Sequence, residues 1–290
     1  MRSDFADGGS YLIEHKLREF LREDIGYGDI TSEALIEKEQ RAKARLLFRE
    51  DGVAAGLEEA AALFSLLGCT VNLLEKDGCR VESGSKVMEV IGKAEAILAG
   101  ERTALNLLGR MSGISTAVAS TVEKIAQVNP SVRVAATRKT APGLRNFDKK
   151  AVELGGGDTH RLRLDDCVLI KDNHLMLGSS VGALVKRARR RVSFTKKVEV
   201  EVRSSEQAVD AAESGADIIM FDNMTPCQIM NCITVLNEQG LRKGRLFEAS
   251  GGITPENVNE YAATGVDVIS MGCITHSVKS LNVKLEIEPI

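Results

Sequence analysis

The chain has 290 residues and a formal net charge of −3, with 43% apolar and 27% charged residues. These proportions are ordinary for globular proteins, and the length corresponds to about two domains. No apolar run approaches the roughly 18 residues of a membrane span, and Asp4 and Asp7 precede any hydrophobic stretch, which argues against a signal peptide. The six cysteines show no CxxC spacing, so we expect free, mostly buried thiols and a cytoplasmic location rather than a disulfide scaffold or zinc ribbon.

The first hundred residues predict a mixed α+β unit of short elements. Residues 11–24 form an amphipathic helix pattern with Ile13, Leu17, Phe20 and Leu21 on one face. Gly26 and Gly28 end this pattern. Strands are expected over 43–48 and 53–57, a second helix over 57–67, and further short strands within 70–92.

From about residue 130, strand-like and helix-like segments alternate. Six runs rich in β-branched residues predict strands, namely Val132–Ala136, Cys167–Ile170, Val198–Val202, Ala216–Phe221, Leu246–Ala249 and Val266–Ser270. Helices are expected between them, for example over 205–214, 225–239 and 255–263, with Pro226 and Pro255 in first turns and Gly215, Gly240 and Gly265 at the ends. This alternation predicts a parallel sheet, either an incomplete α/β barrel or a doubly wound sheet.

Polar residues and glycines follow the predicted strands where each strand ends. They include Thr137-Arg138-Lys139, Lys171-Asp172-Asn173-His174, Asp222-Asn223, Ser250-Gly251-Gly252 and Gly272. One such group alone is an ordinary strand-to-loop transition. Because the carboxyl ends of parallel strands meet at one edge, the groups together predict a ligand-binding mouth.

The third predicted strand alternates valine with charged residues. Val198, Val200 and Val202 share one face, and Glu199, Glu201 and Arg203 share the other. Buried carboxylates need a charged partner or a metal. Glu201 and Asp222 could therefore share Mg²⁺; the alternative is a salt bridge with neighbouring lysines, which suits Glu199 better.

Two further features suit anionic ligands. The turn Ser250–Pro255 and the nearby glycine Gly272 resemble the paired glycine loops that hold phosphate at the end of such sheets. The flexible run Gly155-Gly156-Gly157 brings His160 and Arg161 to the mouth, where Arg161 joins three other cations, Arg138, Lys139 and Lys171.

Other basic residues and histidines have plainer interpretations. The tract Val185–Lys197 holds seven basic residues without interleaved aromatics other than Phe194, which favours a solvated helix face over a nucleic-acid surface. His15 is expected at the surface, and His174 is either structural or close to the ligand site.

Several motifs, in order along nearly the whole chain, resemble the quinolinate phosphoribosyltransferase family. They are Glu23-Asp24 to Thr31, Glu101–Asn106, Ser112–Thr116, Thr137–Arg145, the glycine run to Arg161, and Leu169–His174. The chain departs from the common bacterial pattern at Asp158-Thr159, where an Asn usually precedes the histidine, so no role is transferred to Thr159.

The resemblance implies an open α+β sandwich over residues 1–105, with 279–290 packed back on it, and an incomplete α/β barrel over 106–278. It also implies a homodimer in which each barrel mouth is covered by the partner's N-terminal domain. Hexamers are the alternative assembly. The reaction would join quinolinate to 5-phosphoribosyl-1-pyrophosphate with Mg²⁺, giving nicotinate mononucleotide, pyrophosphate and CO₂ for NAD biosynthesis.

The resemblance also assigns roles to residues. Arg102 from the neighbouring subunit and four barrel residues would hold the quinolinate carboxylates: Arg138, His160, Arg161 and Lys171. Lys139, Glu201 and Asp222 would serve the ribosyl diphosphate and its metal, and with Lys171 form the catalytic set. The 5-phosphate would be held by Ser250, Gly251, Gly252, Gly272 and His276, while Thr137, Cys273 and Ile274 complete the expected substrate contacts.

Three alternatives remain at this point. The same fold and donor could serve nicotinate or another base, although four cations favour a dicarboxylate. An aldolase-type barrel would use Lys171 as a Schiff base. A nucleic-acid binder would use residues 185–197 and bind in a salt-dependent manner.

Overall fold

The computed structural model describes residues 6–290, with side chains from Leu12 onward. Asp4, part of the argument against a signal peptide, lies outside this range. No helix among the described residues is long and apolar enough to span a membrane. The chain divides into two compact units, Met1–Thr116 with Val278–Ile290, and Ala117–Ser277. The boundary falls within helix α4 (Ala94–Ala126), eleven residues after position 105.

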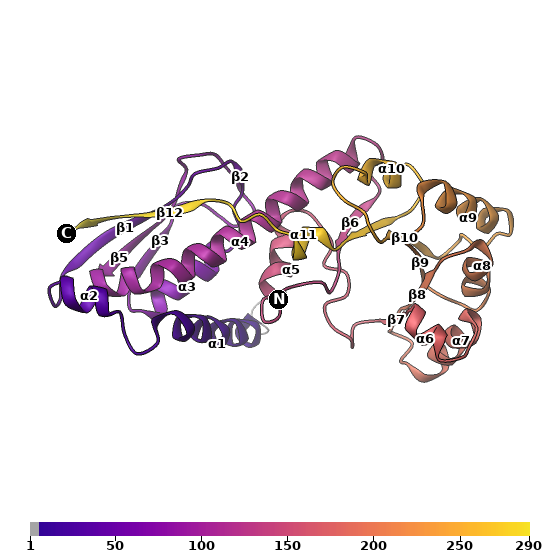
Figure 1. The fold of residues 1–290 in the computed structure, drawn as a ribbon, viewed down its shortest axis with the longest axis horizontal. Helices are drawn as coiled ribbons and strands as arrows, with labels where there is room; N and C mark the ends of the chain where they lie inside the picture. Colours follow the sequence, from indigo (N-terminus) through magenta and orange to yellow (C-terminus); the bar gives the residue numbers. More distant parts are fainter. Residues whose placement is uncertain (1–5) are drawn as a thin grey trace. The chain divides into compact units, whose positions relative to one another are not determined.

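The first unit is built on a four-stranded antiparallel sheet (Figure 1). Its order is β12-β1-β5-β3, so the last strand of the chain pairs with β1. The elements are α1 (Ala6–Ile25), α2 (Ile30–Leu35), β1 (Arg41–Phe48), β2 (Gly52–Val53), α3 (Leu57–Leu66), β3 (Thr70–Leu73), β4 (Arg80–Val81), β5 (Lys86–Lys93) and β12 (Val283–Pro289). Helix α3 contacts β3 and β5, and α1 contacts α3 through a face that buries Leu17 and Leu21.

The strand expected over 53–57 is wrong beyond Val53. Ala54 and Ala55 are fully buried, which explains the strand-like apolar pattern. However, Ala55 N–H donates to Ser112 Oγ at 3.0 Å, and Ser112 Oγ donates back to the Ala55 carbonyl at 3.1 Å. A serine of α4 thus satisfies backbone groups that a strand partner would otherwise satisfy.

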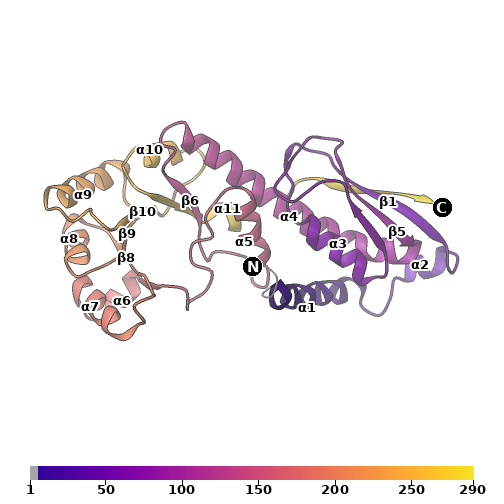
Figure 2. The same ribbon diagram turned by 180° about the vertical axis from the view of Figure 1, so that it is seen from behind.

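The second unit contains the predicted six-stranded parallel sheet. Its order is β6-β11-β10-β9-β8-β7. The elements are β6 (Arg133–Ala136), α5 (Arg145–Leu154), β7 (Val168–Ile170), α6 (Asp172–Met176), α7 (Val181–Arg191), β8 (Val198–Val202), α8 (Ser205–Glu213), β9 (Ile218–Asp222), α9 (Pro226–Glu238), β10 (Leu246–Ser250), α10 (Val258–Ala262), β11 (Val268–Met271) and α11 (Cys273–His276). Figure 2 shows the same elements from behind.

The strand order identifies this sheet as an open barrel. From β7 to β11 the strands follow chain order, and β6 then pairs with β11, as it would in a closed ring. The ring is open between the two edge strands, β6 and β7. Helices α7 and α8 pack on β7, β8 and β9, so the opposite face of these strands lines the barrel interior. This confirms the incomplete barrel, whose valines face helices while Glu199 and Glu201 face inward.

Two smaller expectations differ from the structure. Helix α10 begins at Val258 rather than near Pro255, because Asn257 Oδ1 accepts the Thr254 N–H at 2.8 Å and holds residues 254–257 as a turn. Pro226, in contrast, is the first residue of α9. The six cysteines are free, as expected. Only Cys69 and Cys232 are buried, so the prediction that most of the thiols are buried is wrong.

Candidate active site

A cavity of about 400 Å³ opens at the carboxyl ends of the barrel strands. This volume is within the range of small-molecule sites. Charged residues and the loop after β10 dominate its walls. It is lined by Thr137, Arg138, Lys139, His160, Arg161, Leu169, Lys171, Asp172, Glu201, Arg203, Met220, Asp222, Asn223, Glu248, Ser250, Gly251, Gly252 and Ser270.

Most residues singled out from the sequence line this cavity. They are Thr137, Arg138, Lys139, His160, Arg161, Lys171, Glu201, Asp222, Ser250, Gly251 and Gly252. Four others lie on or just before α11 and are not among the lining residues: Gly272, Cys273, Ile274 and His276. Ile274 is 2% exposed. Arg102 is exposed on α4 within the first unit and is likewise not a lining residue.

The segment after β6 is fixed against α11. Thr275 Oγ1 donates to the Lys139 carbonyl at 2.8 Å, and Thr137 Oγ1 accepts from Lys139 N–H at 3.1 Å. A Cβ on Gly272 would lie 2.9 Å from Lys139 Cδ, so glycine gives the lysine side chain room. Gly272 thus acts on the cavity through Lys139.

The glycine run after α5 brings His160 and Arg161 to the open side of the barrel. Asp158 forms a parallel bridge to Ala135 beside edge strand β6. His160 then adopts a left-handed conformation (φ 49°), and its N–H donates to Asp158 Oδ1 at 2.7 Å. The turn at Asp158 places the two cationic residues in the cavity wall.

The buried side chain of Lys149 holds this turn in place through hydrogen bonds. Its side chain is 2% exposed, and its ammonium donates to the Thr159 carbonyl and, at 3.3 Å, to the Ala136 carbonyl. Burial, followed by the nearby charge of Arg145, lowers the pKa of Lys149 to about 8. Lys149 therefore joins the His160 turn to the end of β6.

Arg161 combines burial with an unsatisfied donor. The residue is 8% exposed, and its Nη2 donates to the Leu164 carbonyl at 3.3 Å. Its Nε is buried without a hydrogen-bond partner in the part of the chain that the structure describes. A buried donor left without a partner is costly, which suits a guanidinium that receives an anionic ligand.

The two carboxylates proposed for a metal each have a cationic partner. Glu201, on β8, pairs with the Lys171 ammonium. Asp222, at the end of β9, accepts from Arg203 at 2.9 Å and from the Asn223 amide at 2.9 Å. Their oxygen atoms fit a hard cation such as Mg²⁺. The lysine salt bridge considered from the sequence is thus present at Glu201, whereas Glu199 pairs with His160 instead.

The glycine loops after β10 and β11 lie side by side. Ser250 and Ser270 are paired in register, and their hydroxyls are 2.9 Å apart. Gly251 (φ 92°) needs to be glycine, because a Cβ there would lie 2.4 Å from Asn223 Oδ1. The short helices that follow contribute less than expected, so the loop itself forms the candidate phosphate site.

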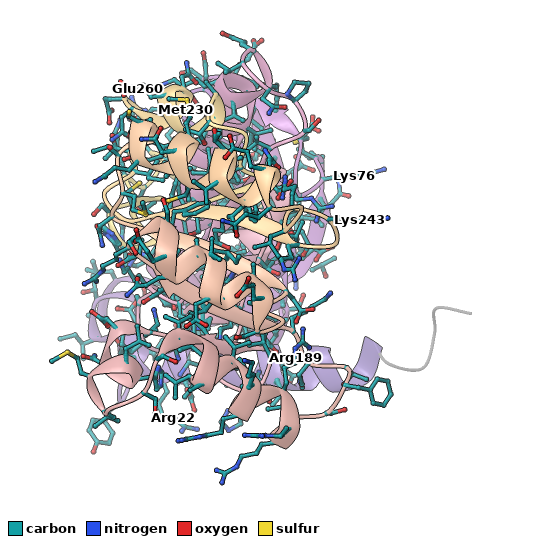
Figure 3. All side chains as sticks on the ribbon, turned by 90° about the vertical axis from the view of Figure 1, so that its right-hand side faces the viewer. Arg22, Lys76, Arg189, Met230, Lys243 and Glu260 are labelled. Atoms are coloured by element: carbon teal, nitrogen blue, oxygen red, sulfur yellow. The ribbon has the colours of Figure 1, made fainter. Side chains whose placement is uncertain are left out.

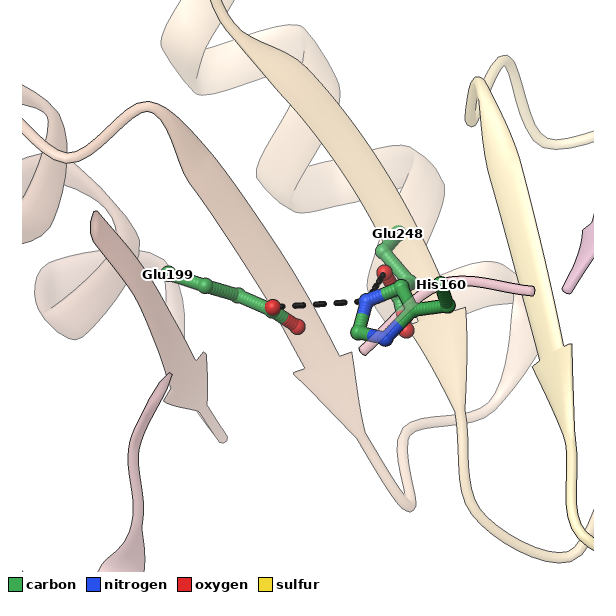
Figure 4. A group of neighbouring side chains, drawn as sticks. All are labelled: His160, Glu199 and Glu248. Carbon is green, nitrogen blue, oxygen red and sulfur yellow. Dashed lines mark ion pairs between the residues drawn. The ribbon is translucent and has the colours of Figure 1, made fainter. Parts of the chain in front are cut away.

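Beneath the cavity, His160 lies between two buried glutamates (Figure 4). Its Nε2 is 3.3 Å from Glu199 Oε2 and 3.2 Å from Glu248 Oε2. Burial alone would lower the pKa of His160, but the two neighbouring glutamates raise it to about 10. The ring is therefore protonated at neutral pH.

Sequence reasoning assigned no role to seven lining residues, although two of them, Asp172 and Asn223, belong to the strand-end groups that predicted the mouth: Leu169, Asp172, Arg203, Met220, Asn223, Glu248 and Ser270. For Arg203 a signal existed, since the alternation in β8 already placed it on the inner face. Glu248 could have been found in the same way, because Phe247 and Ala249 flank it as the valines flank Glu201. Neither residue was assigned a role from the sequence.

The structure also bears on the remaining hypotheses from the sequence, which concern Lys171, the basic tract and two histidines. Lys171 is ion-paired with Glu201, a contact that the aldolase-type hypothesis leaves unexplained. On α7, Arg189 pairs with Asp217 at 2.6 Å, and other basic residues of the tract are exposed (Figure 3). His174 Nδ1 accepts the Lys171 N–H and caps α6, a structural role. His15 is exposed, as expected.

Known proteins resemble both units of this chain. Residues 29–112 match the N-terminal domain, and residues 114–286 the C-terminal domain, of quinolinate phosphoribosyl transferase. A probable nicotinate-nucleotide pyrophosphorylase (carboxylating) of Methanothermobacter thermautotrophicus is 49% identical over 93% of this chain and 97% of its own length. The human nicotinate-nucleotide pyrophosphorylase (carboxylating) is 38% identical over 92% and 89%. The structure of NadC from Streptococcus pyogenes matches with a TM-score of 0.90 and 36% identity, covering 99% of each chain.

Proposed function

The chain belongs to the quinolinate phosphoribosyltransferase family, and we propose that it joins quinolinate to 5-phosphoribosyl-1-pyrophosphate. The products are nicotinate mononucleotide, pyrophosphate and CO₂, a step of NAD biosynthesis. Both substrates carry several negative charges. The observation that carries the proposal is one cavity in which the cations Arg138, Lys139, Arg161 and Lys171 face the glycine loop after β10.

The ribosyl donor fits the β10 side of the cavity. The backbone N–H groups of Gly251 and Gly252 and the hydroxyl of Ser250 suit its 5-phosphate. Displacement of pyrophosphate builds positive charge at the anomeric carbon, which the carboxylates of Glu201 and Asp222 stabilise. Lys139 is exposed on the cavity wall and suits the negative charge of the leaving group.

The pyridine dicarboxylate fits the opposite side. Arg138, His160, Arg161 and Lys171 offer donors to its two carboxylates. Once the ring nitrogen is bonded to ribose, it can accept the electrons released when the 2-carboxylate leaves as CO₂. These side chains need only hold the ring in place for that step.

Mg²⁺ belongs to the proposal as the cofactor, with Glu201 and Asp222 as its protein ligands. When bound, it neutralises the charge that develops on the departing pyrophosphate. We also propose a homodimer in which Arg102 reaches the partner's cavity, with hexamers as the alternative assembly. The free thiols suit a cytoplasmic enzyme.

A steady-state assay with two bases tests the function. The purified chain receives Mg²⁺ and the ribosyl donor with either quinolinate or nicotinate, and nucleotide and CO₂ are measured. Turnover of quinolinate with CO₂ release is expected. Turnover of nicotinate alone would replace the proposal with the same transfer to a monocarboxylate.

A further inference from the structure

Glu248 is a buried acid without an assigned role. It lies on the inner face of β10, is 1% exposed, and its nearest cationic partner among the described residues is His160 at 3.2 Å. Glu199 on β8 is fully buried and approaches the same ring nitrogen from the other side, as Figure 4 shows. Two carboxyl groups on different strands thus converge on one imidazole nitrogen.

These acids depend on the histidine for charge compensation. Glu199 Oε1 and both oxygens of Glu248 have no conventional hydrogen-bond partner within the described chain. Cys167 Sγ, at 3.9 Å, is a weak donor to Glu199 Oε2. Buried carboxyl groups with so few donors are costly unless a cation lies beside them. A protonated His160 meets this need.

The protonation state of His160 decides what its other nitrogen can do. Nε2 is engaged by the glutamates, while Nδ1 makes no hydrogen bond to any described residue. In a neutral ring with the proton on Nε2, Nδ1 carries a lone pair that repels a carboxylate. In the imidazolium, Nδ1–H is a charged donor that binds one.

We propose that Glu248, together with Glu199, is a positioning residue that keeps His160 doubly protonated, so that Nδ1–H donates to a carboxylate of the bound pyridine dicarboxylate. This inference rests on the proposed function. Glu248 does not touch the substrate in this account; it acts through the ring of His160.

The electrostatics of the surrounding groups agree with this arrangement. The proximity of Glu199 and Glu248 overcomes the effect of burial and raises the pKa of His160 to about 10, while burial and the charge of Glu248 raise the pKa of Glu199, so Glu248 is the acid whose removal tests the arrangement. Cys167 stays a thiol, because burial and Glu199 raise its pKa to about 11. The other charged groups that line the cavity are Arg138, Lys139, Arg161, Lys171 and Arg203, together with Asp172, Glu201 and Asp222.

The variant Glu248→Gln keeps the shape of the side chain and removes its charge. We expect the alkaline limb of kcat/KM for quinolinate to move down by about one pH unit or more, which is about a tenfold loss once the pH is above both limbs. Activity should recover towards pH 6, where the ring is protonated without help. The KM for the ribosyl donor should change less than about twofold, since Glu248 is proposed to act through His160 on the dicarboxylate and not on the donor. Glu260→Gln, an exposed change on α10 (Figure 3), is the matched control and should leave both parameters unchanged.

A spectroscopic measurement covers the case in which Glu248→Gln does not fold. Nitrogen-15 NMR of the histidine-labelled full chain follows the four imidazoles through a pH titration, with His160→Gln assigning the signal. A His160 that stays protonated above pH 8 supports the inference. Titration near pH 6.5, or stoichiometric zinc bound through His160, Glu199 and Glu248, would overturn it. A pH-independent loss in Glu248→Gln would overturn it too.

The outcomes separate this inference from the proposed function. If the parent chain does not turn over quinolinate, the function fails, whereas the NMR titration still reports on His160. If the parent turns over quinolinate and Glu248→Gln keeps the parental pH profile, only the role of Glu248 is refuted.

Discussion

Glu201 and Lys139 line the same cavity but differ in how much of the fold depends on them. Lys139 is exposed, and the charged partner of Glu201 among the residues that the structure describes is Lys171. Neither side chain fills the hydrophobic core. A role in the reaction and a role in stability can therefore be separated at these two positions.

We expect Glu201→Gln or Lys139→Ala to lower kcat by about 10²–10³-fold, since each removes a charge placed to stabilise the transition state. The thermal midpoint should stay close to that of the parent. Steady-state kinetics and a melting curve on each variant measure the two effects, with the exposed Lys243→Ala as control (Figure 3). A large drop in the midpoint with little loss of kcat would assign these residues to structure.

Lys149 gives a pH-dependent prediction. Its pKa is about 8 in the folded chain against 10.5 ordinarily, so between these values the unfolded chain binds more protons and stability rises with pH. Lys149→Met removes this pH-dependent contribution to stability. The free energy of unfolding of the parent, minus that of Lys149→Met, should grow by about 1–3 kcal/mol from pH 8 to pH 10.5. Urea unfolding at several pH values measures it, with Lys243→Met as reference; a constant difference would show that the folded pKa is not lowered.

Residue patterns in the sequence predicted the orientation of some of these side chains but not their partners. Alternation in β8 showed that Glu199 and Glu201 face inward, because a strand sends successive side chains to opposite faces. It could not show that the partner of Glu199 is His160, since 39 residues separate them and the contact depends on the left-handed turn at His160. The flexible glycine run placed His160 at the mouth, and the family motifs, rather than any periodicity, assigned its role.

At the scale of elements, the loop from β10 towards α10 is the clearest link between backbone conformation and ligand binding. Gly251 adopts a φ of 92° and lies against Asn223, which itself has a φ of 55°. Asn223 N–H donates to the Ser250 carbonyl at 2.9 Å and its amide to Asp222. Backbone conformation here therefore positions a candidate metal ligand as well as the candidate phosphate site.

Gly251→Ala should raise the KM for the ribosyl donor by about tenfold or more, because the added Cβ forces Asn223 and the loop apart. Gly244→Ala is the matched control, since Gly244 also has a positive φ (79°) but open space around its Cβ position. Both variants should lose about 1 kcal/mol of stability from backbone strain, and Gly251→Ala should lose more because of its contact with Asn223. Equal KM values in the two variants would argue that the loop does not bind the donor.

The six barrel strands could be predicted because most are buried on both faces and each reads as a continuous or alternating apolar run. Short elements held by side chains could not. In the 53–57 segment, the backbone N–H of Ala55 donates to the Ser112 hydroxyl instead of to a neighbouring strand. Helix α10 starts late because the side chain of Asn257 accepts a hydrogen bond from the preceding turn. In both cases a distant or local side chain competes with regular backbone pairing, which a single sequence does not reveal.

At the scale of the whole molecule, the expected substrate residues are divided between two units. Arg102 lies on the part of α4 that belongs to the first unit, while the cavity lies in the second. A homodimer with shared sites would bring such residues together. This arrangement predicts complementation between variants defective in different units.

Mixing Arg102→Ala with Glu201→Gln under conditions of subunit exchange should restore about a quarter of parental activity, since half of the dimers are mixed and each has one intact site. Activity of the mixture, compared with either variant alone, measures this. Two variants of the second unit, such as Lys139→Ala with Glu201→Gln, provide the control and should not complement. Failure of the first pair to recover, despite exchange, would place Arg102 outside a shared site.

The most direct test of the central claim is the stoichiometry of the reaction with quinolinate carrying a labelled 2-carboxylate. In the presence of Mg²⁺ and the ribosyl donor, we predict that each nicotinate mononucleotide formed is matched by one labelled CO₂ and one pyrophosphate. A nucleotide that retains the label, or no reaction with quinolinate at all, would contradict the account.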